Sequence, residues 1–303
     1  MRKIYSQRFK EIMKVLAKYG FKFLRETKSS NKNKSPENLR KAFEELGPTF
    51  IKIGQILSSR PDILPSSYIK ELSKLQDDVL PEKYEDIDIV FFNEFNKNID
   101  ECFLYFERNP IASGSIAQVH NATLKSGEKV IVKVQRPDIK QKMETDISIL
   151  YKIMKLTKNK FKDALIDPEE ALKELLSSTR KELDFNLEAD NMIRFKELNK
   201  NVKFCYVPYI IKDLCGSKVL TMEKVYGFKI NNIEKLEEEN YDLQDLGKKL
   251  ALCFFKQVFT DGFFHADPHP GNLLIKDNKI CFIDFGIMGT ISPRLRLLLN
   301  DAI

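Results

Sequence analysis

The chain has 303 residues, of which 43% are hydrophobic and 31% charged, and its formal net charge is +6. This length and apolar fraction exclude a disordered chain and allow one large domain or two small ones. The mildly basic charge is compatible with phosphate or anionic lipid, but it is too weak and too evenly spread to predict nucleic-acid binding. A lysine-rich solvated surface explains the same charge more simply.

Five cysteines are scattered along the chain, and no two have the close spacing of a zinc or redox site. This pattern predicts reduced thiols and a cytoplasmic location. The sequence has no run of about 18 apolar residues, so we predict no transmembrane helix.

Residues 1–35 are predicted to form a basic amphipathic helix followed by a polar linker. The apolar side chains of this helix lie at helical spacing: Ile4, Phe9, Ile12, Met13, Leu16 and Phe23. Two alternatives remain open. The helix either lies on an anionic membrane surface, peripheral to the inner face, or packs on its own protein.

Residues 36–100 are predicted to form a helical N-terminal extension, interrupted at Gly47-Pro48, Pro61 and Pro65. Residues 101–303 show a mixture of strands and helices. The predicted strands are 117–124, 130–134, 205–210, 218–223, 273–276 and 279–283, and the predicted helices are 138–162, 168–200 and 242–261. This order predicts an α+β fold with a small mixed lobe, about 101–224, and a helical lobe, about 225–303.

Three polar residues near the C-terminus carry a recognisable chemistry. Asp267 and Asn272 are five positions apart, which is the spacing of the kinase catalytic loop. Asp284 follows after a short apolar strand and opens an Asp-Phe-Gly triplet. In phosphoryl transfer, residues of these types orient the nucleophile (Asp267) and ligate Mg²⁺ (Asn272 and Asp284). Two alternatives remain: an ordinary loop, or a metal cluster of His265, Asp267 and His269.

Lys133 lies within an apolar strand and therefore needs a counter-charge or a phosphate, unless it is an edge-strand lysine that points to water. We predict Glu182, on the second long helix, as its partner. Glu188 lies about 120° further around that helix and should serve a different partner.

The segment Ala112, Ser113, Gly114 and Ser115 precedes this strand and has the position of a phosphate-covering loop, although an ordinary tight turn is an alternative. We assign Glu223 and Val225, at and just after the strand 218–223, to the same nucleotide site.

These residues together resemble the UbiB family of atypical protein-kinase-like proteins, from about Leu39 to the C-terminus. The most specific element is the run 45–62, Glu-Leu-Gly-Pro-Thr-Phe-Ile-Lys-Ile-Gly-Gln-Ile-Leu-Ser-Ser-Arg-Pro-Asp, which contains Lys-x-Gly-Gln at 52–55. The runs 73–78, Ser-Lys-Leu-Gln-Asp-Asp, and 265–272, His-Ala-Asp-Pro-His-Pro-Gly-Asn, continue the resemblance. The resemblance implies a two-lobed kinase-like fold.

The resemblance also implies roles for single residues. Lys133 is the nucleotide lysine with Glu182 as its partner, and Asp184 completes a Glu-x-Asp motif. Glu188 is expected to pair with Lys52 of the Lys-x-Gly-Gln motif. That motif, with Gln55, is expected to form a lid where a protein kinase would receive its peptide.

The implied function is an ATP- and Mg²⁺-dependent ATPase, or a kinase of small molecules or lipids, that supports isoprenoid quinone biosynthesis of the ubiquinone type. Candidate partners are a nucleotide, a lipid or quinone precursor, a membrane surface and proteins of a biosynthetic complex, but no nucleic acid. The alternatives are a kinase that phosphorylates proteins and a non-catalytic, nucleotide-dependent scaffold.

The sequence departs from the family in two places. Gly114 interrupts a loop that is often an alanine run, which leaves the choice between ATP and ADP open. Only 17 residues follow Gly286, so we expect a truncated C-terminal lobe.

Overall fold

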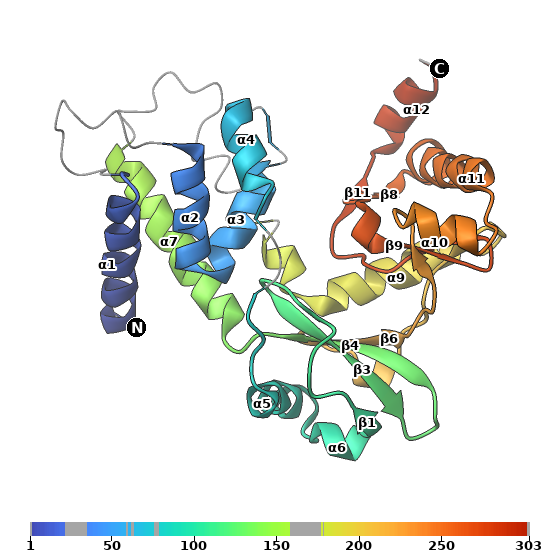
Figure 1. Cartoon of the computed structure of the whole chain (residues 1–303), viewed down its shortest axis with the longest axis horizontal. Helices are drawn as coiled ribbons and strands as arrows, with labels where there is room; N and C mark the ends of the chain where they lie inside the picture. The colour runs from blue at the N-terminus through green and yellow to red at the C-terminus, as the bar shows by residue number, and fades with distance from the viewer. Residues whose placement is uncertain are drawn as a thin grey trace. The chain divides into compact units, whose positions relative to one another are not determined.

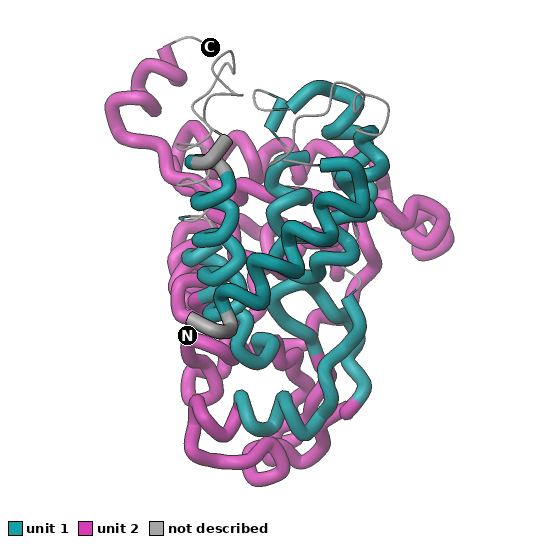
Figure 2. The backbone as a smooth tube through the Cα atoms, turned by 90° about the vertical axis from the view of Figure 1, so that its left-hand side faces the viewer, with its two compact units in different colours: residues 1–90, 109–119, 135–183 teal, residues 91–108, 120–134, 184–303 magenta. Residues whose placement is uncertain are grey.

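The computed structural model describes residues 2–21, 35–58, 60–61, 64–75, 79–157, 177 and 179–301. The chain mixes helices and strands, as predicted, and divides into two compact units (Figures 1 and 2). Unit 1 consists of residues 1–90, 109–119 and 135–183, and unit 2 consists of residues 91–108, 120–134 and 184–303. Among the described helices, none is both long and apolar enough to cross a membrane.

Unit 1 is built mainly from helices. They are α1 (Arg2–Lys18), α2 (Pro36–Leu46), α3 (Pro48–Ser58), α4 (Ser66–Leu72) and α7 (Ile139–Thr157). The Ser35 hydroxyl accepts a hydrogen bond from the Asn38 N–H and so caps the start of α2. Gly47, at φ 91°, separates α2 from α3, which begins at Pro48. The predicted interruption at Gly47-Pro48 is therefore confirmed.

The helices of unit 1 share one apolar core. Ile12 on α1, Phe43 on α2, Phe50 on α3 and Ile147 on α7 are all buried in it. Ile12 and Leu16 of the apolar stripe thus pack on their own protein, which was one of the two alternatives for this helix, while Phe23 lies outside the described residues. Gly54 lies where a Cβ atom would clash with Leu75 and would come within 2.8 Å of Phe43, so the glycine permits close packing of α3.

Unit 2 contains a sheet in the order β1-β3-β4-β6, in which β1 pairs with β3 and β4 pairs with β6 in antiparallel orientation. The strands are β1 (Phe103–Phe106), β3 (Ala117–Leu124), β4 (Lys129–Gln135) and β6 (Val219–Glu223). The first residues of β3 belong to unit 1, where β2 (Ala112–Ser113) pairs with them. Lys133 on β4 stands opposite Leu220 on β6, which places it mid-strand. Helix α9 (Phe185–Asn199) packs against β6.

The rest of unit 2 holds two further small sheets and several helices. The four-stranded sheet has the order β5 (Cys205–Tyr206), β10 (Lys279–Phe282), β9 (Leu273–Lys276), β7 (Phe228–Lys229), and β8 (Phe263–His265) pairs with β11 (Met288–Thr290). The helices are α5 (Tyr84–Phe95, begun in unit 1), α6 (Ile99–Cys102), α10 (Ile233–Glu238), α11 (Leu243–Phe255) and α12 (Pro293–Asp301). Asp277 and Asn278, at φ 50° and 58°, form the tight turn between β9 and β10.

Two predicted elements differ from the structure. The strand expected at 205–210 is reduced to Cys205–Tyr206. The helix expected at 168–200 is interrupted, because residues 179–182 are helical, Leu183 turns, and Asp184 adopts φ −129° and ψ 98° before α9 begins. The part of that prediction at 168–176 lies outside the described residues.

Candidate active site

The centre of the candidate site in unit 2 is Lys133. Its side chain is only 19% exposed, and its Nζ atom lies 2.9 Å from Glu188 Oε2 and 3.3 Å from Asp284 Oδ2. Glu188 stands in the first turn of α9, and Asp284 follows β10. The ammonium group also lies 5.1 Å from the ring centroid of Phe185. Lys133 is therefore not an edge-strand lysine that points to water.

The three charges of this cluster shift one another's pKa values. Burial alone would lower the pKa of Lys133, but the carboxylates of Asp284 and Glu188 outweigh burial and raise it. Burial raises the pKa of Glu188, although Lys133 opposes the shift. Burial would also raise the pKa of Asp284, but Lys133 and the Gly286 N–H lower it to about 2. Lys133 therefore remains protonated between the carboxyl groups of Glu188 and Asp284.

The predicted carboxylate partners are exchanged, and this is a correction. Lys133 pairs with Glu188, not with Glu182. Lys52 pairs with Glu182, at 2.6 Å between Nζ and Oε2, not with Glu188. The reason is the break at Asp184. The angle of about 120° between the two glutamates assumed an unbroken helix, whereas Glu182 precedes the break in unit 1 and Glu188 follows it in unit 2.

The predicted catalytic loop is held together by His265. The His265 Nε2 atom lies 2.6 Å from the Asp284 carbonyl oxygen, so it must carry the proton, and Nδ1 accepts the Asp267 N–H at 3.2 Å. Burial lowers the pKa of this imidazole, which agrees with a neutral ring. The Asn272 side-chain amide donates to the Asp267 carbonyl oxygen at 3.1 Å. These bonds bring Asp267, Asn272 and Asp284 into one network.

The same bonds argue against the alternative of a metal cluster. Both ring nitrogens of His265 are occupied, and His269 Nδ1 accepts the Gly271 N–H at 3.0 Å. Across the described residues, no group of three or more histidine, cysteine or acidic side chains has the geometry of a metal site.

Asn191 was missed by the sequence reasoning. Its side-chain amide donates to the Phe285 carbonyl oxygen at 3.0 Å, while the Phe285 ring is fully buried 5.2 Å from the ring of Phe195. Asn191 lies three residues after Glu188, on the same face of α9, so helical spacing was the available signal. It positions the Asp-Phe-Gly segment against α9.

The predicted phosphate-covering loop, Ala112 to Ser115, lies in unit 1, and Arg136 fixes it. The buried Arg136 guanidinium donates to the Gly114 carbonyl oxygen and to the Ser113 hydroxyl, at 2.8 Å each, and to Glu82 at 2.8 Å. The Gly114 N–H donates to the Ala117 carbonyl oxygen at 2.8 Å. Arg136 was also missed by the sequence reasoning, and its place directly after the strand of Lys133 was the only hint.

The remaining predicted residues have separate roles. Glu223 ends β6 and accepts hydrogen bonds from the Tyr206 hydroxyl at 2.6 and 2.7 Å, and half-buried Val225 follows it. Gln55 Nε2 donates to the Leu75 carbonyl oxygen at 3.4 Å within unit 1. Asp184 Oδ1 accepts the Asn186 N–H at 3.1 Å and so caps α9.

The comparison with known proteins agrees with this geometry. Residues 74–303 match the ABC1 atypical kinase-like domain. The chain belongs to this family. Membership confirms the kinase-like fold and the resemblance to UbiB proteins that the motifs predicted.

Individual curated proteins resemble the chain over most of its length. A protein of Clostridium pasteurianum named "Uncharacterized protein in hydrogenase 1 5′ region" is 62% identical over 98% of this chain and 56% of its own. A "Probable protein kinase UbiB" of Marinobacter nauticus is 38% identical over 85% of this chain and 48% of its own. The chain therefore spans about half the length of the curated relatives it matches.

A solved structure supports the same assignment. The structure of the Rv3197–erythromycin complex from Mycobacterium tuberculosis superposes with a TM-score of 0.60 at 28% identity. The match covers 81% of this chain and 62% of that chain. The ABC1 kinase-like fold thus agrees with an experimental structure as well as with sequence.

Proposed function

We propose that the chain binds ATP with Mg²⁺ and acts as an atypical ATPase, or as a kinase of small molecules or lipids, in isoprenoid quinone biosynthesis. The observation that carries the proposal is the half-buried Lys133 held between Glu188 and Asp284. A lysine in this setting remains charged and is oriented by the glutamate, as phosphate binding in kinases requires. The quinone context rests on the family resemblance and on relatives named UbiB.

The donor set fits Mg²⁺ and a triphosphate. The Asp284 side chain is 39% exposed, so its carboxylate is accessible, and the amide nitrogen of Asn272 is committed to Asp267, which leaves the amide oxygen for a cation. Both are the oxygen ligands that Mg²⁺ prefers. When bound, Mg²⁺ would neutralise phosphate charge. Asp267 would then orient the attacking water or hydroxyl group.

Equilibrium binding of ATP and ADP, with and without Mg²⁺, tests the site. Mg²⁺ should increase the affinity for nucleotide in the parent protein. Asp284→Asn should reduce this increase by about tenfold or more, because one charged ligand of the cation is lost. Asp277→Asn makes the same chemical change on the exposed turn of unit 2 and should leave binding unaltered. Lys133→Ala should weaken both nucleotides, with a circular dichroism spectrum as its folding control. Unchanged binding in Asp284→Asn would show that the assignment is wrong.

A second candidate, protein phosphorylation, is favoured by the name "Probable protein kinase" that several relatives carry. Following the γ-phosphate of ATP over time separates the candidates. Release as inorganic phosphate supports an ATPase, and transfer to protein supports a protein kinase. Binding without either supports a scaffold. A membrane surface as partner stays a prediction, and it does not rest on α1, whose Ile12 and Leu16 side chains are buried.

A further inference from the structure

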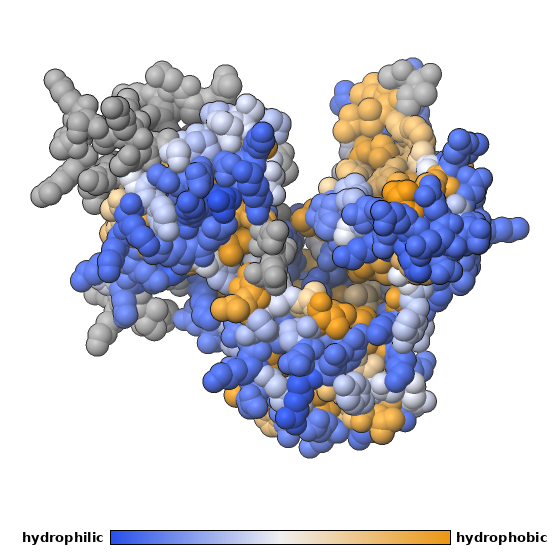
Figure 3. All heavy atoms as spheres, in the orientation of Figure 1, coloured by the Kyte–Doolittle hydropathy of each residue, from blue (hydrophilic) through white to orange (hydrophobic). Residues whose placement is uncertain are grey.

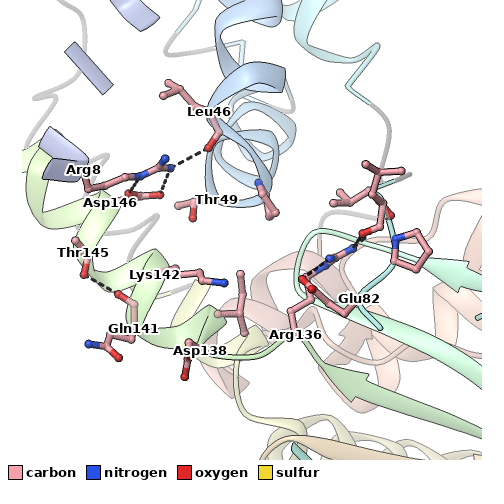
Figure 4. A pocket seen from close by; sticks show the side chains of 15 residues that line it. Arg8, Leu46, Thr49, Glu82, Arg136, Asp138, Gln141, Lys142, Thr145 and Asp146 are labelled. Atoms are coloured by element: carbon pink, nitrogen blue, oxygen red, sulfur yellow. Dashed lines mark hydrogen bonds and ion pairs between the residues drawn. The ribbon is translucent and has the colours of Figure 1, made fainter. Parts of the chain in front are cut away.

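Unit 1 contains a pocket of about 730 Å³ beside the first two turns of α7 (Figure 4). All of its lining residues belong to unit 1. The volume lies within the range of small-molecule sites in proteins, roughly 300–1,000 Å³. The candidate active site uses none of the pocket's side chains except Arg136, which holds the loop at 113–114.

Most charges in the wall of this pocket are already neutralised. Arg8 makes a two-pronged ion pair with Asp146, at 2.7 and 2.8 Å, and donates to the Leu46 carbonyl oxygen at 2.8 Å. Arg136 pairs with Glu82 at 2.8 Å. Satisfied ion pairs offer little charge to a ligand. The remaining wall is largely apolar and includes Leu46, Pro48, Val79, Leu80, Pro81 and Ile139.

Thr49 and Lys142 are two polar side chains of the wall that can meet a ligand, whereas the side chains of Asp138 and Gln141, which also line the pocket, are directed away from Lys142 in Figure 4. Thr49 is 3% exposed, lines the pocket and lies between α3 and α7 in Figure 4. Its hydroxyl can donate a hydrogen bond to an oxygen atom of a ligand. Lys142, at the rim, has its Nζ atom 3.3 Å from the Pro137 carbonyl oxygen, which leaves N–H donors for a further acceptor.

We propose that this pocket binds an amphipathic organic acid, with an apolar body against the walls and a carboxylate that accepts from Thr49 and Lys142. An acid is favoured over an amine because an ammonium ligand would face Lys142 and could only donate to the Thr49 oxygen. The rim carboxylate of Asp138 is directed away from Lys142 in Figure 4, so it does not compete for the ammonium group.

A single-tryptophan reporter tests the proposal, because the natural chain contains no tryptophan. Leu80 lines the rim with its side chain 88% exposed, so Leu80→Trp should leave the fold intact. The fluorescence of this variant is followed while adamantane-1-carboxylate is added. The carboxamide and the methylammonium derivatives of adamantane serve as the neutral and cationic probes. We expect a saturable change with the carboxylate, binding about tenfold weaker with the carboxamide, and none with the amine.

Two variants in the reporter background assign the contacts. Lys142→Met and Thr49→Val should each weaken binding of the carboxylate by about tenfold, the loss of one hydrogen bond to a charged group. Lys140→Met changes an exposed lysine of the same turn that does not line the pocket, and should leave affinity unchanged. The proposal is overturned if the carboxylate gives no saturable signal, if the amine binds as well, or if Lys142→Met binds like its parent.

Discussion

At the residue scale, Glu188 is the most deeply buried charge of the Lys133 cluster. Its side chain is 3% exposed, compared with 19% for Lys133 and 39% for Asp284. Its two oxygens lie 2.9 and 3.2 Å from the lysine ammonium. A carboxylate at this depth is tolerated only while its counter-charge is present, since removing one partner of a buried pair strands the other. The stability of the site therefore depends on Lys133 even without ligand.

We expect Lys133→Met to lower the free energy of unfolding at pH 7 by about 3 kcal/mol, because Glu188 and Asp284 then face each other without a cation. Burial already raises the pKa of Glu188, so the variant should fold with a proton on this carboxyl. A raised folded-state pKa adds stability at low pH that is lost as pH rises, so the deficit should shrink between pH 7 and pH 5. Urea unfolding of the variant and the parent at pH 5 and pH 7 measures this difference in the free energy of unfolding.

A control variant and a second pH dependence accompany this prediction. Lys125→Met, in the exposed turn before the same strand, should change the free energy of unfolding by no more than about 0.5 kcal/mol. In the parent protein the pKa of Asp284 is lowered to about 2, so its effect on stability has the opposite dependence on pH. Its contribution to the free energy of unfolding is present above about pH 4 and is lost as pH falls toward 2. An equal deficit of the variant at pH 5 and pH 7 would contradict the role of Glu188.

At the scale of elements, the sequence predicts what local signals determine. β3 was predicted with its observed bounds, 117–124, because apolar residues and a following Ser-Gly turn define it. The break before α9 was not predicted. An aspartate cap stabilises a helix start by only about 1 kcal/mol, which local helix propensity can match. The start of α9 also depends on a distant contact, since the Phe185 N–H donates to the Ser217 carbonyl oxygen at 3.0 Å.

Asp184 gives a test of this break. Asp184→Ala removes the acceptor for the Asn186 N–H and should lower the free energy of unfolding by about 1 kcal/mol. Asp184→Asn keeps a capping oxygen and should remain within about 0.3 kcal/mol of the parent. Thermal unfolding of the two variants under one buffer condition measures the difference. If Asp184→Asn is as unstable as Asp184→Ala, the charge matters for stability and the cap does not.

At the scale of the whole molecule, the sequence identified the charged residues of the candidate site but not the ion pairs that they form. Lys52, Lys133, Glu182 and Glu188 were all singled out, because short motifs mark each of them. Which acid meets which lysine depends on where the chain leaves unit 1 and enters unit 2, and that point lies at the break before Asp184. Arg136 and Asn191 were missed because their sequence signals, a place after a strand and a helical spacing, are weak, whereas their hydrogen bonds to Gly114 and Phe285 show their roles.

Double-mutant cycles on unfolding test this pairing across both units. Lys52→Met with Glu182→Gln, and Lys133→Met with Glu188→Gln, should each show a coupling of about 1–3 kcal/mol, because both pairs are largely buried. The exchanged cycles, Lys52 with Glu188 and Lys133 with Glu182, should stay within about 0.5 kcal/mol, since each charge has its ion-pair partner in its own unit. The exposed pair Lys235–Glu238 serves as a control, with a coupling of about 0.3–0.5 kcal/mol. Larger coupling energies in the exchanged cycles than in the direct ones would support the pairing of Lys133 with Glu182 and of Lys52 with Glu188 that an unbroken helix predicts.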